Sequence, residues 1–403
     1  MRAIIKPSRA EGRIKVPYSK SIAHRLLIAA SLSEEKSVIR GITPCEDILA
    51  TIDCLSALGA KIKLEGDTAT VEGKDMKSIA PSRPLNCRES GSTLRFLIPI
   101  AALSGAKVLF AGSDRLMERP LSVYEKLFED REMLLARYGG ALIVDGPLAS
   151  GEIMLDGSVS SQFISGLLFA LPLTEGDSII RITPPFESRP YVDLTLAALG
   201  SFGISAEFTD EYTLRIPGSQ SYRGGEFDVE GDWSAAAFID AFSLLDGDAT
   251  AIGLNESSLQ GDKIYKAIYE KLSCGRPTVD ISDCPDLAPI LFALAAAKNG
   301  AVFTGTKRLK HKECERAEAM ALELAKLGGY ISIDYDKVTV RASKLHAPNE
   351  PISAHGDHRI AMAMTVILST IGGEIDGAEA VKKSYPEFFE DIKKLGIDVM
   401  LYD

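Results

Sequence analysis

The segment KRLKHKECER, residues 307–316, concentrates charge that could bind an anion. It holds five lysines and arginines and one histidine, although the whole chain carries a formal net charge of −11. Lys312 and Arg316 would be like-charged neighbours one turn apart on a helix, which is slightly unfavourable unless something compensates them. Glu315 could relieve Lys312, in which case the segment would be an ordinary solvated charge network. Both interpretations stay open from this segment alone.

The residues that follow have the spacing of an amphipathic helix. From Cys314 onward, apolar side chains at positions 317, 320, 321, 324 and 327 fall on one helical face. We therefore expect a helix that includes Cys314 and carries its cations at the start.

Other small hydroxyl side chains and cations also stand where helical patterns begin. Ser19 or Ser21 can cap the apolar helix IAHRLLIAASL, with Lys20 and Arg25 beside it. Free backbone N–H groups at such a start favour an anion. Plain capping with solvated charges explains the same residues equally well.

Three further segments repeat this combination. Gly91, in the turn ESGSTLR, would let a ligand approach the backbone closely. The hydroxyls and amide of SVSSQF (158–163) and the cations of KKSYP (382–386) also precede helical patterns. Each segment alone could be a loop or a cap, but the recurrence favours a site for a small anion.

The segment HGDHR, residues 355–359, raises the alternative of a metal site. His355, Asp357 and His358 are possible metal ligands, and a metal-dependent hydrolase could use them. No further cluster of histidine or cysteine supplies the remaining ligands, and Asp357 is also a natural helix cap.

Length and composition exclude several classes of protein. A chain of 403 residues with 46% hydrophobic and 25% charged residues is typical of a soluble protein with two or three domains. No apolar run reaches membrane-spanning length, and the first residues lack a signal-peptide pattern. A pI near 5.2 argues against nucleic-acid or membrane partners. The six cysteines form no framework and indicate reduced thiols in a cytoplasmic protein.

One pattern recurs along the chain: an amphipathic run ends at a glycine, and an extended segment follows. It predicts six βαβ-containing units, with helix ends at the segments 54–64, 134–144, 196–208, 268–281, 322–333 and 391–401. Glycines near 11–17 and 223–232 suggest two crossings between domains, with three units in each domain.

Together the motifs resemble the 5-enolpyruvylshikimate-3-phosphate synthase group of the enolpyruvyl transferase family. They occur in family order along the whole chain: SKSIAHR, SGSTLR, ERP, SSQF, SRPY, PD at 285–286, RLKHKECER, DHR and KKSYPEFF.

The resemblance implies a two-domain inverse α/β barrel of six βαβαββ units, with the active site in the interdomain cleft. One domain would comprise 1–16 and 229–403, and the other 17–228. The implied enzyme transfers the enolpyruvyl group of phosphoenolpyruvate to the 5-hydroxyl of shikimate 3-phosphate and releases phosphate, a step toward chorismate and the aromatic amino acids. It would be a cytoplasmic monomer that uses no metal or organic cofactor.

The resemblance also implies roles for particular residues. Asp286 would accept the proton of the attacking hydroxyl, Glu313 would move a proton at the methylene carbon, and Lys20 would be the third catalytic residue. The residues implied for shikimate 3-phosphate are Lys20, Ser21, Arg25, Ser160, Ser161, Gln162, Ser188, Tyr191, Asp286 and Lys312. Those implied for phosphoenolpyruvate are Lys20, Gly91, Arg119, Gln162, Arg316, Arg359 and Lys383.

Some positions depart from the family pattern. Lys310, Cys314 and Glu315 replace its usual arginine, serine and aspartate, and Trp233 stands where a small residue is usual. The segment VYEKLFEDREMLLARY is longer than the family's helix there, so its path is open.

The nearest rival is the sister enzyme that transfers enolpyruvate to UDP-N-acetylglucosamine. Its loop before the arginine–proline pair typically carries a cysteine, whereas AGSDRLMERP has none, and SKS replaces its lysine–asparagine pair. A binding protein without catalysis could dispense with Asp286 and Glu313, but both are present.

Overall fold

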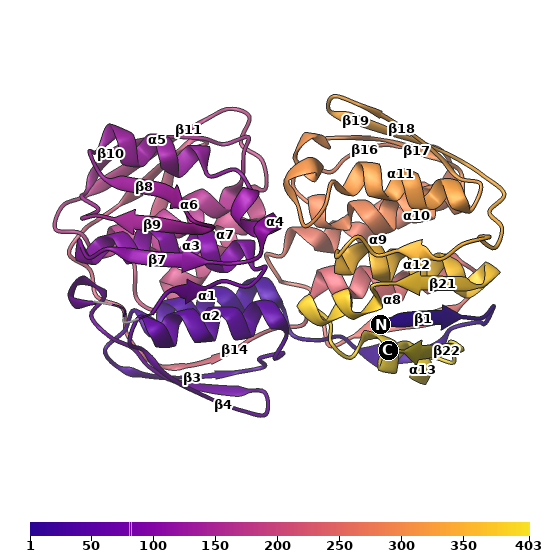
Figure 1. Ribbon diagram of the computed structural model, residues 1–403, viewed down its shortest axis with the longest axis horizontal. Coiled ribbons are helices and arrows are strands. Elements are labelled where there is room, and N and C mark those ends of the chain that lie inside the picture. The colour runs from indigo at the N-terminus through magenta and orange to yellow at the C-terminus, as the bar shows by residue number, and fades with distance from the viewer. Residues whose placement is uncertain (80, 82) are drawn as a thin grey trace. The chain divides into compact units, whose positions relative to one another are not determined.

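The computed structural model describes residues 1–79, 81 and 83–403, and it divides the chain into two compact units (Figure 1). The continuous unit comprises Tyr18–Glu230. The discontinuous unit comprises Met1–Pro17 and Gly231–Asp403. Each unit has its own apolar core.

The continuous unit contains the following elements. Its helices are α1 (Lys20–Ser31), α2 (Glu46–Ala57), η1 (Met76–Ser78), α3 (Gly91–Ala101), η2 (Ala102–Ser104), α4 (Asp114–Glu118), α5 (Ser122–Asp130), α6 (Ser161–Ala170), η3 (Leu171–Leu173) and α7 (Arg189–Ser201). Its strands are β3 (Lys36–Arg40), β4 (Lys61–Glu65), β5 (Thr68–Glu72), β6 (Leu85–Asn86), β7 (Val108–Ala111), β8 (Leu134–Tyr138), β9 (Ala141–Asp145), β10 (Gly151–Asp156), β11 (Ser178–Thr183), β12 (Glu207–Asp210), β13 (Thr213–Ile216) and β14 (Glu226–Asp228).

The discontinuous unit is built from similar elements. Its helices are α8 (Trp233–Leu244), η4 (Gly261–Ile264), α9 (Tyr265–Cys274), η5 (Pro285–Leu287), α10 (Ala288–Ala297), η6 (Lys307–His311), α11 (Arg316–Lys326), α12 (His358–Ile371), η7 (Ala378–Lys383) and α13 (Phe388–Lys394). Its strands are β1 (Arg2–Ile5), β2 (Glu11–Lys15), β15 (Asp248–Ile252), β16 (Thr278–Asp280), β17 (Ala301–Thr304), β18 (Tyr330–Asp334), β19 (Lys337–Arg341), β20 (Ile352–Ser353), β21 (Gly373–Asp376) and β22 (Val399–Tyr402).

Five four-stranded sheets of the described residues share one pairing pattern. In the sheet β6-β7-β9-β8, β6 and β7 pair in parallel, and the hairpin β8–β9 adds two antiparallel strands. The sheets β10-β11-β13-β12, β14-β3-β5-β4, β16-β17-β19-β18 and β20-β21-β1-β22 have the same order and directions. Parallel neighbours need a crossover connection, which explains the helix between the two parallel strands of every one of these sheets except β14-β3-β5-β4.

The remaining sheet explains how the chain passes between the units. Strand β2, which precedes α1, pairs in parallel with β15, and β14, which precedes α8, pairs in parallel with β3. The first strands of two repeats have therefore exchanged places. The predicted six-unit repeat is confirmed, with this exchange added.

The prediction of a helix end at 134–144 is wrong. These residues form the hairpin β8–β9, and its turn residues Gly139 and Gly140 have φ of 57° and 80°. Two positive φ values suit the two-residue turn that matches strand twist, and a glycine pair adopts it without strain. The helix of this repeat, α5, ends earlier, at Asp130. The longer segment after Pro120 is thus a helix followed by a strand.

The other predicted helix ends are found before a strand. After α2, for example, Gly59 has a φ of 108° and β4 begins two residues later. Gly275 after α9 differs, because its backbone is extended.

The first helix of most repeats is buried along most of its length and lies in the core of its unit. In α10, the residues from Ala288 to Ala296 are all buried, and in α12 the residues from His358 to Ser369 are buried. A helix without a polar face is held on every side by packing. The starts of these helices are therefore firmly positioned.

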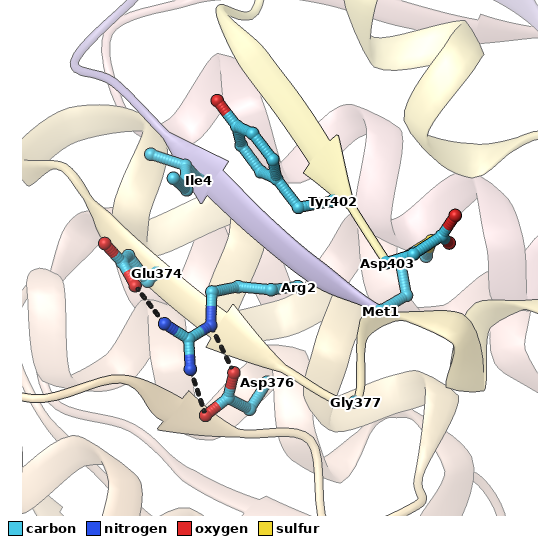
Figure 2. A pocket seen from close by; sticks show the side chains of 8 residues that line it. All are labelled: Met1, Arg2, Ile4, Glu374, Asp376, Gly377, Tyr402 and Asp403. Atoms are coloured by element: carbon cyan, nitrogen blue, oxygen red, sulfur yellow. Dashed lines mark hydrogen bonds and ion pairs between the residues drawn. The ribbon is translucent and has the colours of Figure 1, made fainter.

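The N-terminal strand completes the sheet that also contains the C-terminal strand. β1 pairs along four residues with both β21 and β22. Arg2 reaches across to Asp376 and Glu374, with Nε 2.6 Å from Asp376 Oδ1 (Figure 2). These exposed ion pairs add little stability beside the backbone ladder. In the described part of the chain, no helix has the length and hydropathy needed to span a membrane.

Candidate active site

The residues singled out in the sequence follow the parallel strands of the repeats. Carboxyl ends of parallel strands meet at one edge of a sheet, where the next helix begins. Strand β2 is followed by Lys20, Ser21 and Arg25, β6 by Gly91, β7 by Arg119, β10 by Ser160–Gln162, and β11 by Ser188 and Tyr191. Strand β16 is followed by Asp286, β17 by Lys312, Glu313 and Arg316, β20 by Arg359, and β21 by η7, which contains Lys383.

In the continuous unit, two cations of α1 are fixed by neighbouring helices. Lys20 Nζ donates to Asp47 Oδ2 of α2 at 2.8 Å. Arg25 Nε donates to Thr195 Oγ1 at 2.8 Å, and Arg25 Nη2 donates to the Tyr191 carbonyl at 2.7 Å. Burial lowers the pKa of Arg25 to about 10, so it is still a cation at neutral pH.

Gln162 joins the starts of α6 and α3. Its Oε1 accepts from Arg95 Nη1 at 2.7 Å, and its Nε2 donates to Ser92 Oγ at 2.9 Å. A Cβ built on Gly91 would lie 2.8 Å from Arg119 Nη1. The Gly91 backbone and the Arg119 guanidinium are therefore in close contact.

The predicted serines also lie at helix starts. Ser160 caps α6 by accepting from the Gln162 N–H at 3.3 Å, and Ser161 is the first residue of that helix. Ser188 is buried just before α7, with a φ of 58°. The backbone carbonyl of Ser21 accepts a hydrogen bond from Arg25 Nη1 at 2.6 Å.

In the discontinuous unit, three cations converge on the carboxylate of Asp286. Oδ1 accepts from Lys312 Nζ at 3.0 Å and from Arg316 Nη1 at 2.8 Å. Oδ2 accepts from Arg359 Nη2 at 3.0 Å. Burial disfavours the charged form, but Arg359, Lys312 and Arg316 outweigh it and hold the pKa of Asp286 well below its usual range. Burial, opposed by Asp286, lowers the pKa of Lys312.

Arg316 orients two more carboxylates. Its side chain is 1% exposed. Nη2 donates to Glu313 Oε2 at 2.6 Å, and Nε donates to Asp357 Oδ2 at 2.7 Å. Asp357 also caps α12 by accepting from the Arg359 N–H at 2.9 Å. Lys383 Nζ donates to the backbone carbonyl of Gly356, next to Asp357, at 3.1 Å.

One expectation for residues 307–316 is wrong, and one of the two interpretations that the sequence left open finds no support. Helix α11 begins at Arg316, so Cys314 lies before it, and Lys312 and Arg316 are not neighbours on one helix. Lys312 pairs with Asp286 and not with Glu315, which is exposed. A partly buried carboxylate needs compensating charge, and Asp286 brings together cations whose partner sequence spacing alone left open.

The alternative metal site finds no support in the geometry. His355 Nε2 lies 2.7 Å from Glu323 Oε1, and both oxygens of Asp357 bind the groups named above. Across residues 1–79, 81 and 83–403, no group of three or more histidine, cysteine, aspartate or glutamate side chains could hold a metal ion.

Sequence reasoning missed two carboxylates with the same place in the repeat. Asp47 lies in the first turn of α2, after β3, and Asp262 lies in η4, after β15. Applying the repeat to every parallel strand end would have found both. Asp262 is buried and hydrogen-bonds Ser234, which in turn accepts from Arg359 Nη1.

The buried position of Asp262 predicts a pH dependence of stability. Burial, reinforced by Asp286 and Asp232 and opposed by Arg359, raises the pKa of Asp262 to about 7, whereas an unfolded chain has about 3.9. At pH values between these two pKa values, Asp262 is protonated in the folded protein but ionised in the unfolded chain. The free energy of unfolding should therefore fall as pH rises through this window. Asp262→Asn should remove this loss and be more stable than the parent at pH 8 by about 1–3 kcal/mol.

Urea unfolding at pH 5 and pH 8 measures this effect. Asp248→Asn is the control, because Asp248 is an exposed aspartate of the same unit. If the difference in unfolding free energy between Asp262→Asn and the parent is the same at pH 5 and pH 8, the folded protein does not hold a proton on Asp262 in this range.

The fold and these residues define an α/β enzyme that binds small, multiply charged anions. Cations, hydroxyls and helix starts collect at the strand ends of both units, and carboxylates suited to proton transfer lie among the cations.

Comparison with known proteins names the family. A family model described as EPSP synthase (3-phosphoshikimate 1-carboxyvinyltransferase) matches residues 4–392. Relatives named 3-phosphoshikimate 1-carboxyvinyltransferase include those of Clostridium kluyveri, 39% identical over 98% of this chain and 97% of the relative, and of Clostridium acetobutylicum, 40% identical over 98% and 97%. The chain belongs to the EPSP synthase (3-phosphoshikimate 1-carboxyvinyltransferase) family.

Solved structures share the fold. An EPSP synthase of Acinetobacter baumannii matches with a TM-score of 0.76 at 22% sequence identity, over 99% of this chain and 100% of that chain. The expected fold, the two-domain inverse α/β barrel, is confirmed.

Proposed function

We propose that this chain transfers the enolpyruvyl group of phosphoenolpyruvate to the 5-hydroxyl of shikimate 3-phosphate and releases inorganic phosphate. This is the 3-phosphoshikimate 1-carboxyvinyltransferase reaction of the shikimate pathway (EC 2.5.1.19). Family membership over nearly the whole chain supports it. The observation that carries it is the group of three cations around Asp286, with Glu313 beside it on Arg316.

In this proposal the cations bind the charged groups of two substrates. The residues that we assign to phosphoenolpyruvate are Lys20, Gly91, Arg119, Gln162, Arg316, Arg359 and Lys383. Planar guanidinium groups suit carboxylates and phosphates because they donate in pairs.

Shikimate 3-phosphate is bound mainly by hydroxyls and helix starts. Lys20, Ser21 and Arg25 contact it from α1, and Asp286 and Lys312 contact its ring hydroxyls. The remaining contacts come from Ser160, Ser161, Gln162, Ser188 and Tyr191. Backbone N–H groups at helix starts add partial positive charge for its phosphate.

Proton transfer needs an acid and a base in different environments. Asp286 takes the proton of the 5-hydroxyl as that oxygen attacks C2 of phosphoenolpyruvate, and Glu313 supplies a proton to C3. In the resulting tetrahedral intermediate, Glu313 takes a proton back from the C3 methyl group as the C2–O bond to phosphate breaks, which forms the double bond of the enol ether and releases phosphate. Phosphoenolpyruvate competes with Asp286 for Arg316 and Arg359, and this competition weakens the charge pairing that depresses the basicity of Asp286.

One assay tests the function. Phosphate release from phosphoenolpyruvate is measured with shikimate 3-phosphate and, separately, with UDP-N-acetylglucosamine. Release only with shikimate 3-phosphate is expected. Release only with the sugar nucleotide would transfer the assignment to the sister activity, and release with neither would reject both.

Gly91→Ala should weaken phosphoenolpyruvate binding. The added methyl would lie 2.8 Å from Arg119 Nη1, so the guanidinium must shift. We expect KM for phosphoenolpyruvate to rise about three- to tenfold with a smaller change in kcat, as for lost ground-state binding.

Steady-state kinetics checks this, with Gly200→Ala as control. A Cβ at Gly200, in helix α7, meets nothing within 4 Å. An unchanged KM in Gly91→Ala would show that Gly91 does not line the site.

A further inference from the structure

A buried chain of hydrogen bonds crosses three helices of the continuous unit. His24 Nδ1 on α1 lies 2.7 Å from Thr51 Oγ1 on α2, and Thr51 Oγ1 lies 2.6 Å from Thr93 Oγ1 on α3. Thr93 Oγ1 lies 2.7 Å from Ser90 Oγ, the cap of α3. None of these four residues is more than 1% exposed.

The two ends of this chain meet the starts of two substrate-binding helices. His24 is one turn from Lys20 on α1, and Ser90 is the residue before Gly91. Thr51, in the middle of the chain of hydrogen bonds, is also linked to Lys20. It lies one turn after Asp47, the ion-pair partner of Lys20, and the Thr51 hydroxyl lies 3.3 Å from the Asp47 carbonyl. The chain therefore connects Lys20 with Gly91 through α2, and the helices involved pack on one another.

One direction of donation satisfies the chain. If His24 donates from Nδ1–H to Thr51, then the single Thr51 hydroxyl hydrogen is shared between Thr93 Oγ1 at 2.6 Å and the more distant Asp47 carbonyl at 3.3 Å. Thr93 then donates to Ser90 Oγ, which also accepts from the Thr93 N–H at 3.2 Å. His24 Nε2 has no hydrogen-bond partner among the described residues, and this direction leaves it with a lone pair instead of a buried N–H. Burial lowers the pKa of His24 to about 3, which keeps the ring neutral at physiological pH.

Such a chain of hydrogen bonds fixes the positions of α1, α2 and α3 relative to one another more sharply than apolar packing does. Each hydroxyl bond has a preferred length and direction, and losing one member leaves buried polar partners unsatisfied. Apolar side chains of the same shape would fill the space but would allow α3 to shift along α1 and α2.

We propose that His24, Thr51 and Thr93 are positioning residues that hold the Ser90–Gly91 start of α3 in register with Lys20, and thereby set the affinity for phosphoenolpyruvate. This inference rests on the proposed function. It assigns these residues no contact with substrate; they act through Lys20 and Gly91.

Removing single hydroxyls tests the proposal in the full-length protein. Thr51→Val and Thr93→Val keep the side-chain shape and delete the hydrogen bond. Each should raise KM for phosphoenolpyruvate about fivefold, the size expected for one lost buried hydrogen bond, while kcat changes less than about twofold. Thr51→Ser, which keeps the hydroxyl, should restore most of the affinity.

The double variant and a matched control separate positioning from general stability. Thr51→Val combined with Thr93→Val should be little worse than either alone, because both break one chain. Thr365→Val is the control: this threonine is also fully buried in a helix, but its hydroxyl ends on its own helix at the Ala361 carbonyl, 2.8 Å away. It should leave KM unchanged even if the melting temperature falls.

Hydrogen exchange gives a readout that does not depend on turnover. Amides of residues 87–95 should exchange faster in Thr51→Val than in the parent or in Thr365→Val. Lower melting temperature in Thr51→Val with KM and exchange unchanged would overturn the proposal. A parent enzyme inactive with shikimate 3-phosphate would reject the proposed function instead, and the exchange result would still decide whether the chain positions α3.

Discussion

Arg316→Met is expected to cost about 3–5 kcal/mol of folding stability, the penalty typical of removing one partner of a buried ion pair. The guanidinium is 1% exposed and donates to Asp286, Glu313 and Asp357. Methionine fills much of the same volume, so packing is largely kept, but three carboxylates lose a common cation. Asp357 has no exposed surface through which water could compensate.

Urea unfolding at neutral pH measures this loss. Arg341→Met is the matched control, because Arg341 is an exposed arginine of the same unit that stacks on the Tyr330 ring at 4.4 Å. It should change stability by less than about 1 kcal/mol. Arg316→Lys should fall between the two, since lysine keeps the charge but cannot bind three carboxylates with a planar fork. A loss below about 1 kcal/mol in Arg316→Met would show that the carboxylates find other partners.

Much of this architecture could be predicted from one sequence because the repeat leaves local signals. A glycine such as Gly59 after an amphipathic run marks the end of a helix wherever it occurs. Gly139 and Gly140 give the same local signal although they close a hairpin, since a glycine pair serves both a helix end and a tight strand turn. Which use applies depends on where α5 ends, and that is decided by tertiary packing.

The candidate site was less fully predictable because its pairings join distant segments. The sequence offers Glu315 as one possible partner of Lys312, but the carboxylate that pairs with it is Asp286, 26 residues away in the chain. Asp47 belongs to none of the motifs found in the sequence, yet it forms the ion pair with Lys20. The exchange of β2 and β14 likewise depends on strand pairing that no local pattern records. Local sequence thus indicates which groups collect at helix starts, whereas the partners of each charge follow from the fold.

Asp286→Asn and Glu313→Gln should each lower kcat by at least about 100-fold, the contribution typical of a positioned proton-transfer group. Both substitutions keep the shape of the side chain and remove its capacity to take up or release a proton. Asp286 is held ionised by Arg359, Lys312 and Arg316, which leaves it ready to accept a proton once those cations bind substrate. Glu313 is oriented by the same guanidinium, Arg316, at 2.6 Å.

The two roles differ in what each variant should do to isotope exchange. In D₂O, proton movement at C3 introduces deuterium into the methylene group of phosphoenolpyruvate and product, and Glu313→Gln should slow this exchange about as much as it slows turnover. Asp286→Asn should lower kcat by blocking attack of the 5-hydroxyl. Glu318→Gln is the control, because Glu318 is an exposed residue of α11. Unchanged kcat with a raised KM in either variant would mean that its carboxylate only positions the cations, since a group needed in the transition state must affect kcat.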